Sequence, residues 1–323
     1  MDEADLSQAN LGLAQLQKTR LDSCVLKQAN LTGADLSEAR LIKADLTGAK
    51  LSECNASKAN FSEAMLDDAK LEEADLTEAL FNQCSLRRAN LTAAVLTGAQ
   101  CKQANFEAAI LTQVQAGEAL FDEAILDQAK LDEADFSETS LKLASLKGAS
   151  MRFAQFRGGN FDQAILESVE AERVNFSNAQ MTSATFQNGQ FSDADFSAAD
   201  VSHANFEQAT LTRASFTGAI ASHTNMRLVD MTEVRAAGGA NFDHANLEQV
   251  TANGAIWMQS SLREANLKWA DMQRCNLNQA DLTGANCVAA DMKNSDLTRA
   301  NLKDTNLSDS NLFECQLENA NIT

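Results

Sequence analysis

Large apolar residues recur at every fifth position along almost the whole of this 323-residue chain. They run in steps of five from Leu6 to Ala236 and, after one slip, from Phe242 to Ile322. We call each of them the centre of a unit. A small residue, most often Ala, usually lies two positions before the centre, and two mostly polar residues follow it. The chain therefore consists of about 64 short units of one pattern.

A five-residue spacing excludes one long amphipathic helix. Because a helix turns about 100° per residue, the centres would be spread around all its sides and leave no stripe to bury. A short extended segment fits better, since alternation turns the small residue and the centre inward and the residue between them outward. The two remaining residues then form a corner, and repetition wraps the chain into a tube of stacked coils.

Individual units resemble the pentapeptide-repeat family, whose consensus is Ala, Asp or Asn, Leu and two variable residues. Typical units are Ala34-Asp35-Leu36-Ser37-Glu38 and Ala280-Asp281-Leu282-Thr283-Gly284. The resemblance covers essentially the whole chain and implies an all-β fold, a right-handed quadrilateral parallel β-helix with four units per coil. Twenty residues per coil correspond to about 16 coils, and a rung spacing of about 4.8 Å corresponds to a rod roughly 77 Å long.

We expect a single domain over residues 1–323 with one irregularity in its repeat. The register runs through 4–238, slips by one residue near Gly238 or Gly239, and resumes through 240–323. Around the slip, Val229, Val234 and Val250 replace the usual small Ala. We favour a bulge at a corner, and a hinge or recognition point is the alternative.

The large aromatic residues are consistent with the twenty-residue coil. An inward aromatic ladder along one face is predicted for Phe136, Phe156, Phe176, Phe196 and Phe216, which are spaced by twenty. Trp257 would lie one coil above Ala236 and beside Ala252, two undersized centres that leave it room. The chain has no Pro, as expected where nearly every coil offers its N–H groups to a neighbour.

All seven cysteines occupy inward positions: Cys24, Cys54, Cys84, Cys101, Cys275, Cys287 and Cys315. No two of them are 20 or 21 residues apart, so we expect buried thiols in a reducing compartment rather than disulfides between coils. The first residues do not show the basic and apolar pattern of a signal peptide, and no apolar run reaches membrane-spanning length. We therefore expect a cytoplasmic protein without membrane contact, with leaderless secretion as the alternative.

The formal charge of −19 comes from 45 acidic and 26 basic residues. Two denser acidic segments contain Glu63, Asp67, Asp68, Glu72 and Glu73, and Asp122, Glu123, Asp132 and Glu133. This sign disfavours direct nucleic-acid binding. Several members of the family that the chain resembles imitate B-form DNA and bind DNA gyrase or topoisomerase IV. However, about 0.25 charges per Å is well below the roughly 0.6 per Å of duplex DNA.

The three histidines share one place in their units. His203, His223 and His244 are each the last corner residue, separated by 20 and then 21 residues, with Glu264 next above. They should stack in one outer column. We favour a simple ladder of like side chains, and a Zn²⁺ or Ni²⁺ site and a pH-sensitive contact are the alternatives.

A candidate partner contact lies near the slip, where Leu228, Trp269 and Val288 share one outer side. The sequence has no nucleophile elbow, phosphate-cradling glycine loop or paired-cysteine metal motif, so no enzyme and no cofactor are expected. It predicts a non-enzymatic, acidic, rod-like interaction scaffold for unidentified protein partners. The alternatives are a DNA mimic that inhibits or protects a type II topoisomerase and a secretion-associated effector module. Uncapped terminal coils would favour end-to-end self-association or fusion to another domain.

Overall fold

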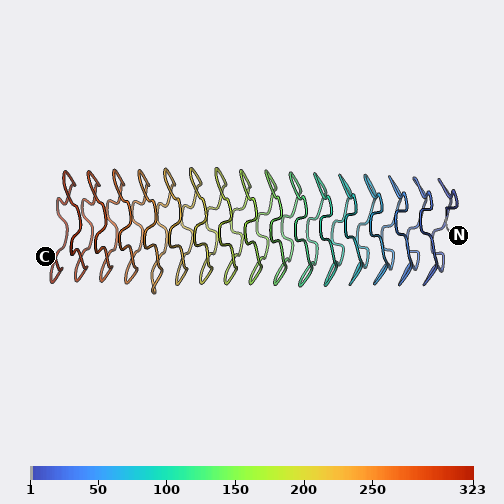
Figure 1. Cartoon of the computed structure of the whole chain (residues 1–323), viewed down its shortest axis with the longest axis horizontal. Helices are drawn as coiled ribbons and strands as arrows, with labels where there is room; N and C mark the ends of the chain where they lie inside the picture. The colour runs from blue at the N-terminus through green and yellow to red at the C-terminus, as the bar shows by residue number, and fades with distance from the viewer. Residues whose placement is uncertain (1–2) are drawn as a thin grey trace. The chain divides into compact units, whose positions relative to one another are not determined.

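A computed structural model describes residues 3–323 and shows one short backbone motif repeated throughout (Figure 1). The chain divides into two compact units, Met1–Ile165 and Leu166–Thr323, called here the N-terminal unit and the C-terminal unit. Within the described residues there is no helix, and the extended elements are single bridging residues rather than longer strands. Each unit is therefore built from very short extended segments joined by corners.

Parallel bridges between successive coils set the register. In the N-terminal unit they join residues twenty positions apart, as in Asp5↔Val25 and Ser145↔Ile165. The C-terminal unit has the same spacing on both sides of its irregular coil. The bridging residue is the one between the small residue and the centre of each unit. Four five-residue units thus make one coil of a parallel β-helix.

The backbone hydrogen bonds of one unit explain its five positions. Four of the five N–H groups donate to backbone carbonyls. The N–H of Ala34 donates to the preceding centre at 2.9 Å, and that of Asp35 donates to the previous coil at 2.9 Å. The N–H groups of Leu36 and Glu38 donate to the next coil at 2.6 and 2.9 Å. The fifth, that of Ser37, donates to Oδ1 of Asp35 at 3.0 Å. Asp or Asn at the bridging position therefore satisfies the one N–H that the backbone leaves over.

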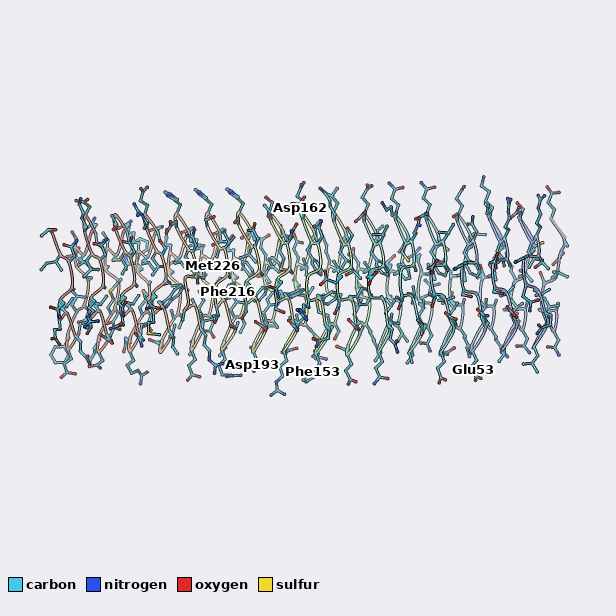
Figure 2. All side chains as sticks on the ribbon, turned by 90° about the horizontal axis from the view of Figure 1, so that it is seen from below. Glu53, Phe153, Asp162, Asp193, Phe216 and Met226 are labelled. Atoms are coloured by element: carbon cyan, nitrogen blue, oxygen red, sulfur yellow. The ribbon has the colours of Figure 1, made fainter. Side chains whose placement is uncertain are left out.

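The core is formed by the small residues and the centres, as the alternation predicts. Both sets are fully buried through most of each unit, whereas the bridging residues between them face outward. Figure 2 shows Phe216 and Met226 inside the C-terminal unit and Asp193 at its surface. The predicted aromatic ladder is confirmed within each unit by centroid distances of 5.3 Å for Phe136 and Phe156 and 4.9 Å for Phe196 and Phe216.

The second residue of each corner has a left-handed backbone. Its φ lies between 53° and 62° wherever the residue is not glycine. No Val, Ile or Thr occupies this position, whereas the preceding corner position accepts them, as at Thr92 and Val288. A side chain branched at Cβ clashes with the backbone at such a φ. The second corner position therefore selects against side chains branched at Cβ, although it faces solvent in most units.

The register changes at one corner of the C-terminal unit. Bridges span 21 residues from Ile220↔Asn241 to Arg235↔Ile256, and they span 20 again from Asn241↔Ser261 onward. The extra residue is accommodated by Gly238 and Gly239, both exposed, with φ of 69° and 82°. An added Cβ on Gly239 would meet no atom within 4 Å.

Large and small side chains compensate one another in the interior next to this corner. Trp257 is completely buried, and its indole packs edge-on against Phe242 at 4.9 Å between centroids. The small centres Ala236 and Ala252 leave volume for it. Its buried Nε1–H has no hydrogen-bond partner. Close packing of the ring therefore holds Trp257 in the core, and its indole N–H contributes no hydrogen bond.

The cysteine side chains face inward, and six of the seven are buried. Burial raises the pKa of Cys54, Cys275 and Cys287 to about 12. The pKa of Cys315, which is partly exposed, is raised by burial as well. None of the seven forms a disulfide. A reducing location stays a prediction.

Replacing Ala93, whose φ is 57°, with Val should lower the free energy of unfolding by about 1–2 kcal/mol, because a branched Cβ clashes in the left-handed region. Ala93→Gly should be neutral or slightly stabilising. The guanidinium midpoint of both variants measures this difference. Thr112, the first corner residue of the next coil, supplies the control, since Thr112→Val should leave the midpoint nearer to wild type. Equal losses for Ala93→Val and Thr112→Val would contradict the backbone explanation.

Ellman's reagent should label Cys315 first at pH 8, because the other six thiols are shielded in the core. Burial also raises the pKa of Cys54, Cys84, Cys101, Cys275 and Cys287, which disfavours their thiolates. The protection is complete below the unfolded thiol pKa near 9 and is lost as the pH rises toward the folded value near 12. Cys315→Ser should abolish the fast phase while leaving six thiols that react on unfolding. Immediate labelling of several thiols in the native protein would show that the core is open.

Candidate interaction surface

The histidine column predicted from the sequence is present in the C-terminal unit. The rings of His203 and His223 are parallel within 2° with centroids 4.9 Å apart, and those of His223 and His244 within 7° and 4.7 Å apart. Glu264 continues the column, with its Oε2 3.4 Å from Nδ1 of His244. Each of these residues is the left-handed second residue of its corner. The rungs of the β-helix therefore set the ring spacing.

This column is a ring stack. Within residues 3–323, no group of three or more His, Cys, Asp or Glu side chains is arranged to hold a metal ion. The stacked rings form a ladder of like side chains, and the metal site stays a prediction. The pH-sensitive contact stays a prediction.

Most of the acidic candidates in the N-terminal unit are paired with cations or amides of a neighbouring coil. Ion pairs join Glu63 to Lys43 at 3.4 Å, Asp68 to Arg88 at 2.6 Å and Asp122 to Lys102 at 3.3 Å. The hydrogen bonds from Arg88 lower the pKa of Asp68. Glu123 and Glu133 accept hydrogen bonds from Gln103 and Gln113 at 2.8 and 2.9 Å. The three ion pairs offset negative charge at Glu63, Asp68 and Asp122, whereas the glutamine amides leave the charges of Glu123 and Glu133 in place.

Three further acidic candidates bond to the chain itself. Asp67 and Asp132 each accept the N–H of the corner residue one coil above, at 3.1 and 2.9 Å, together with a serine hydroxyl. Glu72 accepts from the Ser52 hydroxyl at 2.6 Å and from an asparagine amide at 2.8 Å. Glu73 is exposed. Since the candidates belong to several different columns, they do not form one continuous row of unpaired charge.

The apolar candidates lie along one corner of the C-terminal unit, called here the Trp269 corner and comprising Leu228, Trp269 and Val288. Trp269 is 49% exposed and Leu228 is 38% exposed, while Val288 is half-buried. The N–H of Trp269 donates to the carbonyl of Val288 at 3.0 Å, so these two corners are in direct contact. Leu228 belongs to the same column as Trp269, with Gln249 on the coil between them.

Two features fix this corner in place. The Nζ of Lys268 lies 3.9 Å from the centre of the Trp269 ring, a cation–π contact. Beside the corner runs a ladder of asparagine amides, each donating its Nδ2 to Oδ1 of the Asn one coil below at 3.0 to 3.2 Å. The ladder consists of Asn205, Asn225, Asn246, Asn266 and Asn286. The indole is thus exposed on a backbone that side-chain hydrogen bonds hold rigid.

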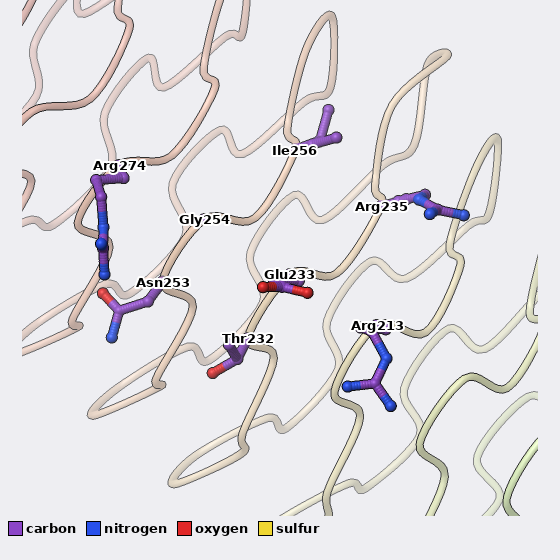
Figure 3. Close-up of a pocket in the computed structure, with 8 residues that line it drawn as sticks. All are labelled: Arg213, Thr232, Glu233, Arg235, Asn253, Gly254, Ile256 and Arg274. Atoms are coloured by element: carbon purple, nitrogen blue, oxygen red, sulfur yellow. The ribbon is translucent and has the colours of Figure 1, made fainter.

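Sequence reasoning did not identify two shallow depressions in the C-terminal unit. One, of about 500 Å³, is lined by Arg213, Thr232, Glu233, Arg235, Asn253, Gly254, Ile256 and Arg274, and Figure 3 shows its arginines around Glu233 and Gly254. The other, of about 370 Å³, shares Arg213 and Arg235 with it. The arginines of the larger depression are spread over residues 213–274 in the sequence, so no local pattern marks it. The coil register is needed to assign them to one side of the unit.

The described residues contain no helix that is long and apolar enough to cross a membrane.

A family model described as pentapeptide repeats, in eight copies, matches segments along the whole chain. The matched residues are 1–37, 9–48, 44–83, 74–113, 124–163, 149–188, 160–197, 190–232, 240–279, 260–299, 275–312 and 290–323. No curated protein matches the chain. The family and the parallel twenty-residue register agree on a right-handed β-helix.

Among solved structures, the chain is similar to HetL, a pentapeptide repeat protein involved in heterocyst differentiation regulation in the cyanobacterium Nostoc. The identity is 27%, over 62% of this chain and 88% of HetL, with a TM-score of 0.48. QnrB1, a plasmid-mediated fluoroquinolone resistance protein, matches at 18% identity over 50% of this chain and 87% of its own, with a TM-score of 0.26. Both TM-scores lie below 0.5, so neither similarity indicates a function for this chain.

Replacing Asn246 with Asp should lower the free energy of unfolding by about 1–3 kcal/mol, because a carboxylate cannot donate to Oδ1 of Asn225 and leaves that oxygen facing a negative charge. Chemical denaturation at pH 7 measures the loss. Asn178→Asp makes the same change at an exposed corner position outside the ladder and should cost much less. If the two variants lose equal stability, the ladder contributes nothing specific.

Proposed function

Because the chain belongs to the pentapeptide-repeat family, whose members are generally non-enzymatic scaffolds, we propose that it binds a protein partner through the Trp269 corner. The observation that carries this proposal is the exposure of nearly half of the Trp269 side chain on a regular, hydrogen-bonded backbone. Tryptophan is enriched among residues that dominate binding energy at interfaces. A rigid corner would lose little conformational entropy when a partner covers it.

The chemistry of the corner suggests the kind of partner. Leu228, Trp269 and Val288 supply apolar area, while Lys268 and Arg227 supply positive charge next to it. Arg227 is itself paired with Glu207 at 3.2 Å, which leaves Lys268 as the cation on the indole. A partner with an apolar pocket flanked by a carboxylate fits this arrangement.

The alternative, a DNA mimic that binds gyrase or topoisomerase IV, has less support. Mimicry of duplex DNA requires continuous rows of uncompensated negative charge. In the N-terminal unit, Glu63, Asp68 and Asp122 are instead paired with cations of the neighbouring coil. The resemblance to QnrB1 is limited to its fold. We therefore rank the scaffold first and place it, as a further part of the proposal, in the cytoplasm.

Trp269→Ala should weaken partner binding by about 30-fold or more, the loss typical of a hot-spot residue. A photo-crosslinker placed at position 228 would first identify the partner, and calorimetry with the purified partner would then measure the affinity. Phe313→Ala is the matched control, because Phe313 is also exposed at a corner with a lysine, Lys293, 5.4 Å from its ring centre. Its affinity should remain near wild type.

A gyrase supercoiling assay with the purified chain distinguishes the two functions. If the chain is a scaffold, it should not inhibit gyrase when the chain is present at micromolar concentration. Salt-sensitive inhibition that Trp269→Ala leaves unchanged would overturn it in favour of mimicry. Equal affinity losses for Trp269→Ala and Phe313→Ala would overturn the assignment of the corner.

A further inference from the structure

We propose that the histidine column is an acid-activated contact for a second copy of this chain. His203 and His223 of one copy pair with Glu118 and Glu138 of another when the imidazoles are protonated. The two columns share one backbone geometry, and at low pH they carry opposite charges. This contact lies apart from the Trp269 corner and does not rest on the proposed function.

The histidine column is the part of the surface that responds to pH. All three histidines of the chain belong to it. Imidazole is the side chain whose charge normally changes between pH 5 and pH 8, whereas carboxylates, lysines and arginines normally stay ionised over this range. Acidification to pH 5.5 therefore changes the surface charge of the chain mainly at this column.

His203 and His223 have no carboxylate partner among the described residues. Oε2 of Glu264 lies 3.4 Å from Nδ1 of His244 and serves only that end of the column. The other charged groups beside the column are bonded elsewhere: Asp200 accepts the N–H of Ser202 at 2.9 Å, Asp243 accepts the N–H of Arg263 at 3.0 Å, and the Arg263 guanidinium pairs with Asp281 at 3.6 Å. Protonation therefore leaves two uncompensated imidazolium groups.

Protonation also makes the ring stack repulsive. The rings of His203 and His223 are parallel within 2°, with centroids 4.9 Å apart. Two imidazolium charges at this distance repel one another. A pair of carboxylates brought alongside offsets this repulsion, and it fits best if its own spacing is that of one coil.

Glu118 and Glu138 provide such a pair in the N-terminal unit. They are exposed second corner residues on successive coils, with φ of 60° and 58°, against 59° and 58° for His203 and His223. The N–H of each of these four residues donates to a first corner carbonyl one coil above, at 2.8 to 3.0 Å. The coil spacing therefore sets the separation within both pairs.

Both glutamates are free of competing cations. Earlier in the same column, the carboxylate of Glu78 is paired with Lys58 at 3.7 Å. Glu118 and Glu138 form no ion pair with a described residue. An added Cβ on Gly158, the next residue of the column, would lie 2.6 Å from Cδ of Glu138, so the missing side chain gives this carboxylate its room. The pair thus presents two unpaired charges on an open corner.

An apolar side chain lies beside each column. Ile220, on the coil of His223, is 46% exposed, and Leu120, two residues after Glu118, is half-buried. Contact between the columns can bring these side chains together and bury apolar area that exposed ion pairs alone would lack. A second copy therefore fits the histidine column in both charge and apolar character.

Sedimentation velocity of the full chain at pH 7.5 and pH 5.5, at constant ionic strength, tests the proposal. The chain should self-associate about tenfold or more tightly at pH 5.5, because two exposed ion pairs form only there. Raising the salt concentration at pH 5.5 should dissociate the complex, since salt screens exposed charges.

Variants of both columns test the pairing. The double variant His203→Arg/His223→Arg should associate at pH 7.5 as wild type does at pH 5.5, and His203→Gln/His223→Gln should stay monomeric at both. Arg and Gln occur at the same corner position elsewhere, as at Arg213 and Gln249, so both variants keep the fold. Glu138→Gln should weaken the association at pH 5.5.

Glu78→Gln is the matched control for Glu138→Gln, because Glu78 lies in the same column but is already paired with Lys58. It should leave the association unchanged. The proposal is overturned if wild type stays monomeric at pH 5.5, or if His203→Gln/His223→Gln associates as wild type does. It is also overturned if salt does not weaken the association, or if Glu78→Gln and Glu138→Gln lose equal affinity.

Discussion

The structure depends on satisfying five backbone N–H groups in every five-residue unit. Four are bonded to carbonyls of the preceding centre and of the two adjacent coils, as in the unit around Leu36, and the fifth needs a side chain. The acceptor is the bridging Asp or Asn of the same unit, as at Asp35, or a corner Asp of the coil below, as Asp67 is for Arg87. The same requirement explains the absence of Pro, which would remove one of the five donors.

These hydrogen bonds also determine where functional side chains can occur. The centre and the small residue are buried, and the bridging residue is often engaged in capping the corner. Chemical variety is consequently concentrated at the corners, where residues on successive coils form columns. The stacked rings of His203 and His223 and the Arg213–Asp193 pair arise in this way, whereas the cation–π contact of Trp269 joins the two residues of one corner. The contacts within a column therefore join residues of neighbouring coils, so the chemistry of the column is set by one pair at a time.

Periodicity made much of the fold predictable. The spacing of twenty placed the Phe196–Phe216 stack and the histidine column correctly, because the register depends on backbone geometry that every unit shares. The spacing could not predict which surface side chains are paired or hydrogen-bonded. Asp67 counts as an acidic candidate in the sequence, yet its carboxylate accepts the N–H of Arg87. The hollow at Gly254 was missed since it results from one absent side chain among its neighbours on adjacent coils.

The corner at Gly238 and Gly239 shows how the fold tolerates a change in length. One coil contains 21 residues, and the bridges return to twenty immediately afterwards, so every column of the C-terminal unit continues in phase. Additional chain at this corner is thus insulated from the hydrogen-bonded ladder on either side. The two glycines mark a natural graft point, at which a foreign loop or epitope can be displayed while the surrounding columns keep their spacing.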